Sequence, residues 1–450
     1  MSQSKRSILC VVLALFASAC GGSATGVMPP SCVGASGAGF ASPGSVLPKR
    51  TGSITRRPSN LPRHAPDRLL VKFRTGAQPT LVQSVHQQAG GSVIRIISKL
   101  NVHIVRVDAA NMAPVMASYR ASPFVEFVEN DAYIYAAAIP NDSLYSLQWH
   151  YPAINLPAAW DVVTGPNCVI VAVIDTGIRP HQDLTWVAGY DFFSDDADPT
   201  DSGCSADPND FSHGMHIAGT IAALTNNSIG VAGVNWGGST GTQIMPLRVL
   251  GESGGTCGVG TASMVADALV YATDNGAKVA NMSFGGPASS TLENGVNYAY
   301  SRGVTLVAAA GNTDPVTGTA VTYPAAYPNV IAVGATDCNN ARASYSNFGP
   351  ELDLMAPGGD SVSCSGDPAP EEILSTSWSP NGDNGYYFGS GTSFSTPHVS
   401  GLAVLLIARG IVGPANIQNR LQSTAQDLPP AGRDPLTGWG LVNAAAAVGP

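Results

Sequence analysis

Short, almost unbroken apolar runs that alternate with glycine-punctuated helical segments constrain this chain more than any other feature. Beyond residue 140 they include Val169–Ile174, Val279–Ser283, Val304–Ala308 and Val330–Val333. A strand that lacks polar alternation is buried on both faces, as strands are in parallel sheets covered by helices on both sides. We therefore expect residues 139–450 to form an α/β domain with a doubly wound, mainly parallel sheet in three layers (αβα).

A different pattern precedes this domain and predicts a small α+β unit of ferredoxin-like βαββαβ order over residues 67–138. The predicted elements are Arg68–Phe73, Pro79–Ala89, Ser92–Ile97, Val102–Val107, Asn111–Ala121 and Val125–Val128. Residues 21–66 are rich in Gly, Ser, Pro and Arg without apolar periodicity, which predicts a flexible linker. The order of elements alone does not identify what this unit does.

Residues 1–20 have the layout of an export signal. Lys5 and Arg6 precede the apolar run Ile8–Phe16, and small residues follow up to Cys20. The run is too short to span a bilayer. The Ala-Ser-Ala-Cys ending resembles a bacterial lipobox, which predicts a lipid-bearing Cys20 and a place in the cell envelope. The alternative is an ordinary signal peptide, since Ala17 stands where lipoboxes prefer Leu.

The charge distribution bears on possible partners. The formal net charge is −9, and only eight of the 22 Lys and Arg residues follow Pro140. An acidic main domain has no basic stripe to release counterions from nucleic acid, which argues against nucleic acid as a partner and favours cation binding as the electrostatic theme. Nothing in the sequence suggests oligomerisation, and we expect a monomer.

Cysteines in an exported protein suggest disulfides. Beyond Cys10 and Cys20 there are six, namely Cys32, Cys168, Cys204, Cys257, Cys338 and Cys364. Connectivity is not fixed by sequence; we favour the pairs Cys204–Cys257 and Cys338–Cys364, each joining loops of one domain. This leaves Cys32 and Cys168 as candidates for free thiols.

Two of the four parts needed for serine-based peptide hydrolysis, an orienting acid and a base, follow in chain order. Asp175 ends the run Val169–Ile174, and His213 opens an apolar helical segment. Asp-Thr-Gly is also an aspartic peptidase signature, but the only other candidate, Asp201-Ser202-Gly203, lies in a polar loop. His213 and His216 could be metal ligands, yet no Glu follows the first as in zinc peptidases.

The nucleophile and an oxyanion donor complete the set. Ser393, within Gly-Thr-Ser-Phe-Ser-Thr-Pro-His at 391–398, opens a core helix that includes His398–Ala408. Free amides and the dipole at a helix start favour a developing oxyanion. Asn312 follows a buried strand and supplies a side-chain amide. Gly-Gly-Ser-Thr-Gly at 237–241 has the letters of an α/β-hydrolase elbow but loop-like surroundings and the wrong order.

Four blocks together resemble the signatures of the subtilisin family, and the likeness runs from about Asn141 to Asn443. They are Val-Ile-Asp-Thr-Gly at 173–177, His-Gly-Met-His-Ile-Ala-Gly-Thr at 213–220, Ala-Gly-Asn at 310–312, and the Ser393 block. The resemblance implies a serine endopeptidase that works through an acyl-enzyme. By it, Asp175 orients His213, the general base and acid for the nucleophile Ser393. Asn312 and the Ser393 amide would form the oxyanion hole.

The sequence departs from the family pattern at Met215, Phe394 and Ser395, where the family has Thr or Ser, Met and Ala. None of these changes removes a reacting atom. The family likeness also implies two backbone segments that clasp an extended substrate by strand addition. The implied substrate-binding residues are Gly254, Gly255, Thr256, Ser283, Phe284, Gly285 and Thr322. No charge is evident in the implied pocket, so we expect uncharged residues before the cut.

Structural calcium is the cofactor that the resemblance implies, through a loop at 225–231 whose oxygen ligands suit a hard cation. The implied ligands are the side chains of Asp142, Asp183 and Asn227 and the backbone oxygens of Thr225, Ile229 and Val231. The alternative is an ordinary Asn-rich turn. The resemblance further makes the βαββαβ unit a propeptide that assists folding and inhibits the enzyme until it is cut near Ala136–Pro140.

A rival hypothesis is a catalytically idle, lipid-tethered surface protein that uses the same fold for binding. An idle descendant would be expected to lose at least one of Asp175, His213, Asn312 and Ser393, and all four are present. We therefore expect an active enzyme. Because His213 must be neutral to act as a base, activity should fall in acid.

Overall fold

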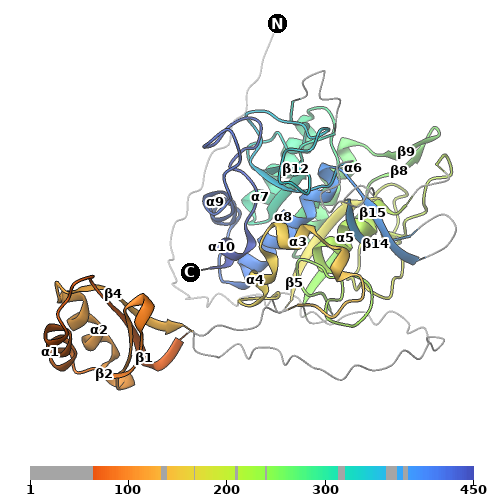
Figure 1. The fold of residues 1–450 in the computed structure, drawn as a ribbon. Helices are drawn as coiled ribbons and strands as arrows, with labels where there is room; N and C mark the ends of the chain where they lie inside the picture. Colours follow the sequence, from red (N-terminus) through yellow and green to blue (C-terminus); the bar gives the residue numbers. More distant parts are fainter. Residues whose placement is uncertain are drawn as a thin grey trace, which may run out of the picture.

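The chain forms two bodies, each with its own sheet and hydrophobic core (Figure 1). The structure is a computed structural model. It describes residues 64–132, 139–166, 168–207, 211–238, 241–312, 320–360, 372–378 and 384–449. The expected export signal, Cys20 and most of the expected linker and cut site therefore lie outside the described residues.

The N-terminal body has the predicted βαββαβ order. Its elements are β1 (His64–Phe73), α1 (Pro79–Ala89), β2 (Ser92–Ile97), β3 (Val102–Arg106), α2 (Met112–Ala121) and β4 (Val125–Ala132), with the 3-10 turns η1 (Ser98–Leu100) and η2 (Ala109–Asn111). The antiparallel sheet has the order β2-β3-β1-β4. Helix α1 begins with Pro79 and ends before Gly90, whose left-handed φ of 79° suits glycine. The ferredoxin-like arrangement is confirmed.

The second body is built on a seven-stranded sheet of order β13-β12-β11-β10-β5-β7-β6 in which every neighbouring pair is parallel. Its strands are β5 (Val169–Asp175), β6 (Tyr190–Asp191), β7 (Thr242–Arg248), β10 (Val279–Met282), β11 (Thr305–Ala309), β12 (Ile331–Thr336) and β13 (Leu354–Pro357). The four apolar runs singled out in the sequence are all central strands of this sheet, with ends shifted by a few residues.

Helices cover the sheet in two pairs, α5 with α8 and α6 with α7, and both pairs contact its strands. They span α5 (His213–Ala222), α6 (Ala262–Asp274), α7 (Ser290–Ser301) and α8 (Thr392–Ala408). Shorter helices are η3 (Tyr145–Leu147), α3 (His150–Ala153), α4 (Leu156–Trp160), α9 (Pro414–Ser423) and α10 (Ala444–Val448). The predicted doubly wound αβα architecture is confirmed.

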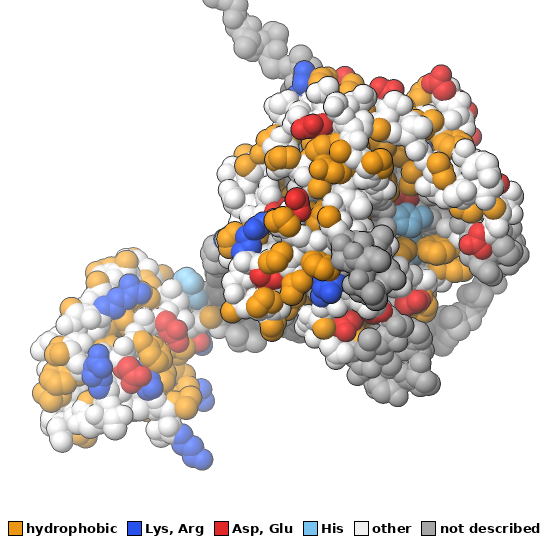
Figure 2. Space-filling model, turned by 90° about the horizontal axis from the view of Figure 1, so that it is seen from above, with side chains coloured by type: hydrophobic (Ala, Val, Ile, Leu, Met, Phe, Trp, Pro, Cys, Tyr) orange, Lys and Arg blue, Asp and Glu red, His pale blue; other side chains and the backbone are white. Residues whose placement is uncertain are grey.

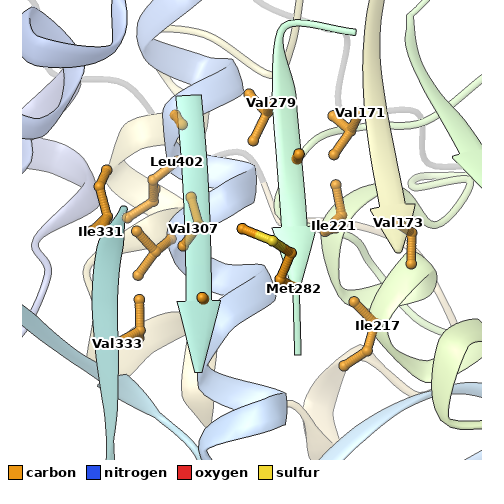
Figure 3. Close-up of a cluster of buried hydrophobic side chains, with 14 of the residues drawn as sticks. Val171, Val173, Ile217, Ile221, Val279, Met282, Val307, Ile331, Val333 and Leu402 are labelled. Atoms are coloured by element: carbon orange, nitrogen blue, oxygen red, sulfur yellow. The ribbon is translucent and has the colours of Figure 1, made fainter. Parts of the chain in front are cut away.

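The core fills the space between the sheet and these helices. Figure 3 shows side chains of β5, β10, β11 and β12 beside Ile217 and Ile221 of α5 and Leu402 of α8. All of α8 from Phe394 to Leu406 is buried, which explains its lack of a polar face. Because neighbouring strands are parallel, their carboxyl ends and the starts of α5 and α8 meet at one edge of the sheet.

Two hairpins that the sequence analysis did not predict lie outside the main sheet. They are β8 (Gly251–Ser253) with β9 (Thr256–Val259), and β14 (Ile373–Trp378) with β15 (Asn384–Gly389). No helix in the described part of the chain is long and apolar enough to cross a bilayer.

The expected disulfide Cys204–Cys257 is present, with the two Cα atoms 5.6 Å apart. Cys168 is also disulfide-bonded, so the expectation of a free thiol at that position is wrong. Cys338 is disulfide-bonded as well, whereas Cys32 and Cys364 lie outside the described residues.

Candidate active site

Asp175 is the last residue of β5 and lies at the carboxyl edge of the sheet, fully buried. Its Oδ1 atom is 2.8 Å from Nδ1 of His213 and also accepts a hydrogen bond of 2.7 Å from the Thr176 amide. A carboxylate that accepts from Nδ1–H fixes the tautomer and the orientation of the imidazole. The lone pair on Nε2 is then free to accept a proton. This pair can therefore serve as base and orienting acid.

Two glycines allow this approach. A Cβ atom on Gly214 would lie 2.4 Å from the carbonyl oxygen of Gly177. Gly177 itself has a φ of +108°, and a Cβ atom there would lie 2.5 Å from the carbonyl oxygen of Pro199. Glycine is required at both places because no side chain fits, as the sequence prediction of a turn after Asp175 anticipates.

Ser393 is the second residue of α8, so its amide is one of the free N–H groups at the helix start. Its hydroxyl donates to the carbonyl of Ser283 at 2.8 Å, and the Ser283 hydroxyl donates back to the Ser393 carbonyl at 2.8 Å. The next side chain, Phe394, packs edge-on against the His213 ring with centroids 5.4 Å apart. The structure thus brings Ser393 and His213 to the same edge of the sheet.

Asn312 lies just beyond the end of β11, and its amide is held in one orientation. Its Oδ1 atom accepts from the backbone amide of Thr392 at 2.8 Å and from the Thr392 hydroxyl at 2.7 Å. With the oxygen held, the Nδ2 group faces Gly391, where an added Cβ atom would be 3.1 Å away. An amide donor therefore stands beside the residues that open α8.

A cleft of about 280 Å³ adjoins His213. It is lined by Thr176, Asp201, Gly203, Cys204, Phe211, His213, Arg248, Leu250, Gly251, Cys257, Gly258, Ser283 and Phe284. Its walls come from the ends of three strands, the β8–β9 hairpin and the polar loop before α5. Figure 2 shows one face of the molecule, on which acidic side chains are scattered among hydrophobic ones on the second body.

The expected substrate-binding residues divide into two groups. Ser283 and Phe284 line the cleft, and a Cβ atom on Gly285 would lie 2.1 Å from the Thr322 hydroxyl, so these two residues adjoin. Gly254 and Gly255 form the exposed tip of the β8–β9 hairpin, followed by Thr256, and do not line the cleft.

Asp201 and Arg248 line the cleft although the sequence analysis assigns them no role. Arg248 is buried, and its Nη1 atom donates to Asp191 Oδ2 at 2.5 Å and to Ser194 Oγ at 3.1 Å. A charged residue ending an apolar run of a parallel sheet is a usable signal, because such ends gather at the active edge. Pro246 lies within that run, and because proline is unfavourable inside a sheet, the sequence analysis did not predict this strand.

The expected calcium ligands lie together. The loop 225–231 wraps Asp142 and Asp183: the Asp142 carboxylate accepts from the Asn226 amide, at 2.8 Å to Oδ2, and Asp183 Oδ2 from the Val231 amide at 3.1 Å. Burial raises the pKa of both carboxyls, that of Asp183 to about 6, and their mutual repulsion adds to that of Asp183. Asn227 Nδ2 donates to Asp183 Oδ1 at 2.6 Å, so the third expected side chain lies beside the carboxylates. Two buried carboxylates beside a side-chain amide fit a hard cation.

His216 belongs to the core. Its Nε2 atom lies 2.9 Å from the Ile373 carbonyl and 3.1 Å from that of Tyr387, and burial lowers its pKa to about 3. It is therefore a neutral imidazole that ties α5 to the β14–β15 hairpin. Within the described residues no group of three or more His, Cys, Asp or Glu side chains is arranged to hold a metal ion.

Comparison with known families gives two matches. Residues 167–440 match the subtilase family, Peptidase_S8, and residues 54–131 match the fervidolysin N-terminal prodomain. An extracellular protease from Xanthomonas campestris is 36% identical over 440 residues, which cover 88% of this chain and 72% of that protein.

Two solved structures are also similar. A protease from Pseudoalteromonas arctica superimposes with a TM-score of 0.60 at 37% identity, covering 69% of this chain and 98% of its own. Fervidolysin from Fervidobacterium pennivorans, described as a keratinolytic enzyme related to subtilisin, gives a TM-score of 0.58 at 27% identity. That match covers 85% of this chain and 61% of fervidolysin.

Proposed function

This chain is a member of the subtilase family, a subtilisin-like serine protease with a propeptide, and from that premise we propose that Asp175, His213 and Ser393 are its catalytic triad. The observation that carries the proposal is the 2.8 Å contact between Asp175 Oδ1 and His213 Nδ1 at the sheet edge where α8 begins with Ser393. Asp, His and Ser follow one another in the chain in the order that the family signatures have.

In the proposed reaction, neutral His213 accepts the Ser393 hydroxyl proton at Nε2 as Oγ attacks the scissile carbonyl carbon. The Asp175 carboxylate stabilises the imidazolium. His213 then donates the proton to the leaving amine, which leaves an acyl-enzyme on Ser393. Water attacks the acyl carbon by the reverse sequence of proton transfers and frees the enzyme.

The negative oxygen formed in each step is stabilised by Asn312 Nδ2 and by the backbone amide of Ser393. Support comes from the two hydrogen bonds that hold the Asn312 oxygen on Thr392, since they leave the amide group as a fixed donor. Donors that are oriented before the reaction need no reorganisation during it.

We propose that substrates bind as extended chains along the cleft, between the segment Ser283–Gly285 and the β8–β9 hairpin, with the side chain before the cut next to Gly285 and Thr322. Main-chain recognition of this kind accepts many sequences, so the substrates are proteins and peptides in general. Gly254, Gly255 and Thr256 would act through the backbone of the hairpin tip. We propose that the enzyme works as a monomer.

Calcium is the proposed structural cofactor, held by the side chains of Asp142, Asp183 and Asn227. The backbone oxygens of Thr225, Ile229 and Val231 are proposed to complete the set. The burial of both carboxylates supports this, because two buried anions without a cation repel each other. When bound, the ion supplies charge neutralisation and fixes the loop; it takes no part in peptide hydrolysis.

We propose the domain division as residues 1–20 signal, 21–66 linker, 67–138 propeptide and 139–450 catalytic domain. The propeptide would inhibit the enzyme until self-cleavage near Ala136–Pro140. The extracellular relative from Xanthomonas campestris is consistent with export. Lipidation at Cys20 would hold the precursor at the membrane, and the cut would then release the enzyme.

The test compares the precursor with its Ser393→Ala variant in calcium-containing buffer, by intact mass and casein digestion. We expect the parent to trim itself near residue 138 and to digest casein, while the variant stays full length and inert. Folding of both is checked by circular dichroism. A folded parent that neither trims itself nor digests casein would overturn the proposal.

A further inference from the structure

The side chain of Asp201 connects the two chain segments that carry Asp175 and His213. It is buried, with an exposed fraction of 4%, although it comes from a polar loop. Its Oδ2 atom accepts from the Thr176 hydroxyl at 2.7 Å and from the Ser212 hydroxyl at 2.5 Å. Thr176 directly follows Asp175, and Ser212 directly precedes His213. One carboxylate oxygen thus accepts from the residue next to the orienting acid and from the residue next to the base.

The hydrogen bonds continue from these neighbours to the pair itself. The Thr176 hydroxyl accepts from the Gly214 amide at 3.0 Å, while the Thr176 amide donates to Asp175 Oδ1 at 2.7 Å. With its own proton donated to Asp201, the Thr176 hydroxyl keeps its lone pairs for the Gly214 amide and links the first turn of α5 to the end of β5. The bond to Asp201 therefore fixes the direction of the hydroxyl that joins the two segments.

Asp201 is itself firmly held. Its amide donates to the Ile178 carbonyl at 3.1 Å, its Oδ1 atom accepts from the Gly203 amide at 2.8 Å, and Arg179 Nε donates to its carbonyl. Three residues further on, the Cys204–Cys257 disulfide attaches the loop to the β8–β9 hairpin. The carboxylate is thus a fixed reference point and not a mobile surface group.

Ser212 is equally constrained. Its amide donates to the Trp378 carbonyl at 2.9 Å, and its own carbonyl accepts from the Ser377 hydroxyl at 3.0 Å. Only the direction of the Ser212 hydroxyl is left open by these bonds, and the Asp201 carboxylate fixes it. Hydrogen bonds to a charged acceptor are shorter and stronger than those between neutral groups, so they orient hydroxyl donors well.

We propose that Asp201 is a positioning residue of this protease, one that sets the geometry of the Asp175–His213 pair through Thr176 and Ser212. The proposal rests on the triad proposed above. An amide cannot replace the carboxylate: the side chain of an Asp201→Asn variant would offer a donor where either the Gly203 amide or the two hydroxyls now donate. A small displacement of a catalytic pair can cost about 10²-fold in rate.

The test uses the mature enzyme and the variants Asp201→Asn, Ser212→Ala, Thr176→Val and Thr176→Ser. Active sites are counted with a fluorophosphonate so that kcat refers to folded, reactive enzyme. We expect kcat to fall about 10- to 10²-fold in Asp201→Asn and less in Ser212→Ala, with KM within about twofold. Thr176→Ser should keep the activity that Thr176→Val loses, because the hydroxyl does the positioning.

The decisive measurement is a double-mutant cycle with Asp175→Asn. If Asp201 acts through the pair, Asp201→Asn added to Asp175→Asn should lower kcat less than about threefold further. An equal loss in both backgrounds, or an effect on KM alone as expected of a substrate contact, would overturn the proposal. If Asp201→Asn does not fold, Ser212→Ala and Thr176→Val replace it in the double-mutant cycle with Asp175→Asn.

A matched control is Asp337→Asn, which removes another buried carboxylate that accepts from backbone amides, those of Asn339 and Ala341. We expect it to lower stability and to leave kcat unchanged. The Ser393→Ala enzyme separates the two proposals. A parent no more active than Ser393→Ala would defeat the proposed function, whereas an active parent with an unaffected Asp201→Asn would defeat only this inference.

Discussion

At the scale of single residues, Asn312 makes a direct prediction. Asn312→Ala should lower kcat by about 10²–10³-fold while KM changes little, because the amide acts on the oxyanion and not on the ground-state carbonyl. Steady-state kinetics on a chromogenic peptide measures both constants. Asn329→Ala serves as the control, since that partly exposed side chain donates to Asn297, which has no proposed role. A rise in KM with unchanged kcat would assign Asn312 to substrate binding instead.

The residues of the proposed triad could be predicted from the sequence because each stands in a local motif whose spacing is set by one strand end or one helix start. Asp201 could not. Its proposed role arises where segments distant in the chain meet, and the polar loop around it carries no periodic signal. Ser212 likewise looks like an ordinary residue before a helix until the carboxylate is seen beside it.

At the scale of elements, the loop 225–231 predicts a dependence of stability on calcium. Removing calcium with a chelator should lower the melting temperature of the main transition of the full-length Ser393→Ala precursor by roughly 5–10 °C, as expected for the loss of about 3 kcal/mol of ligand binding. Scanning calorimetry with and without the chelator measures the shift.

The control for the calcium prediction is built on the same chain. Asp183→Asn should melt at nearly the same temperature with and without the chelator, whereas Asp274→Asn, which changes an exposed carboxylate, should behave like the parent. The same calcium shift in Asp183→Asn as in the parent would place the ion elsewhere.

Elements were predictable from the sequence where periodicity and glycine punctuation agree, as for α1, β5 and α8. Strand β7 was not, because Pro246 lies within it and proline is unfavourable inside a sheet. The structure accommodates it beside β6, which is only two residues long. The β8–β9 and β14–β15 hairpins were not predicted for another reason, since both are short and partly polar. The Cys204–Cys257 disulfide holds the first hairpin, and His216 holds the second.

At the scale of the whole molecule, the N-terminal body carries a buried pair of histidines that relates its stability to pH. His86 Nδ1 lies 2.8 Å from the Tyr119 hydroxyl, and His86 Nε2 lies 2.9 Å from His103 Nδ1. Phe73 packs edge-on against both imidazoles. Burial, reinforced by His103, lowers the pKa of His86 to about 4, and burial also lowers that of His103.

The sign of the pH effect follows from these shifts. In the unfolded chain both histidines titrate near pH 6.5, so between pH 6.5 and 4 the unfolded state binds more protons than the folded one. The contribution of the two neutral histidines to the free energy of unfolding is therefore complete above pH 6.5, and it is lost as the pH drops toward 4. For His86 alone the loss is about 3 kcal/mol, a large part of what so small a domain possesses.

We therefore predict that acid loosens the propeptide before it affects the catalytic body. In the full-length Ser393→Ala precursor, calorimetry should show the transition of the N-terminal body moving to lower temperature from pH 7 to pH 5, ahead of the main transition. His86→Phe with His103→Leu should flatten this dependence, because no buried base remains to be protonated, while the control His64→Gln, at a half-buried histidine outside this pair, should not. A transition equally sensitive to pH in the double variant would assign the effect to other groups. If the propeptide inhibits the enzyme as proposed, its unfolding releases the active site, so the active parent precursor should also gain casein activity faster after a pulse at pH 5 than after one at pH 7.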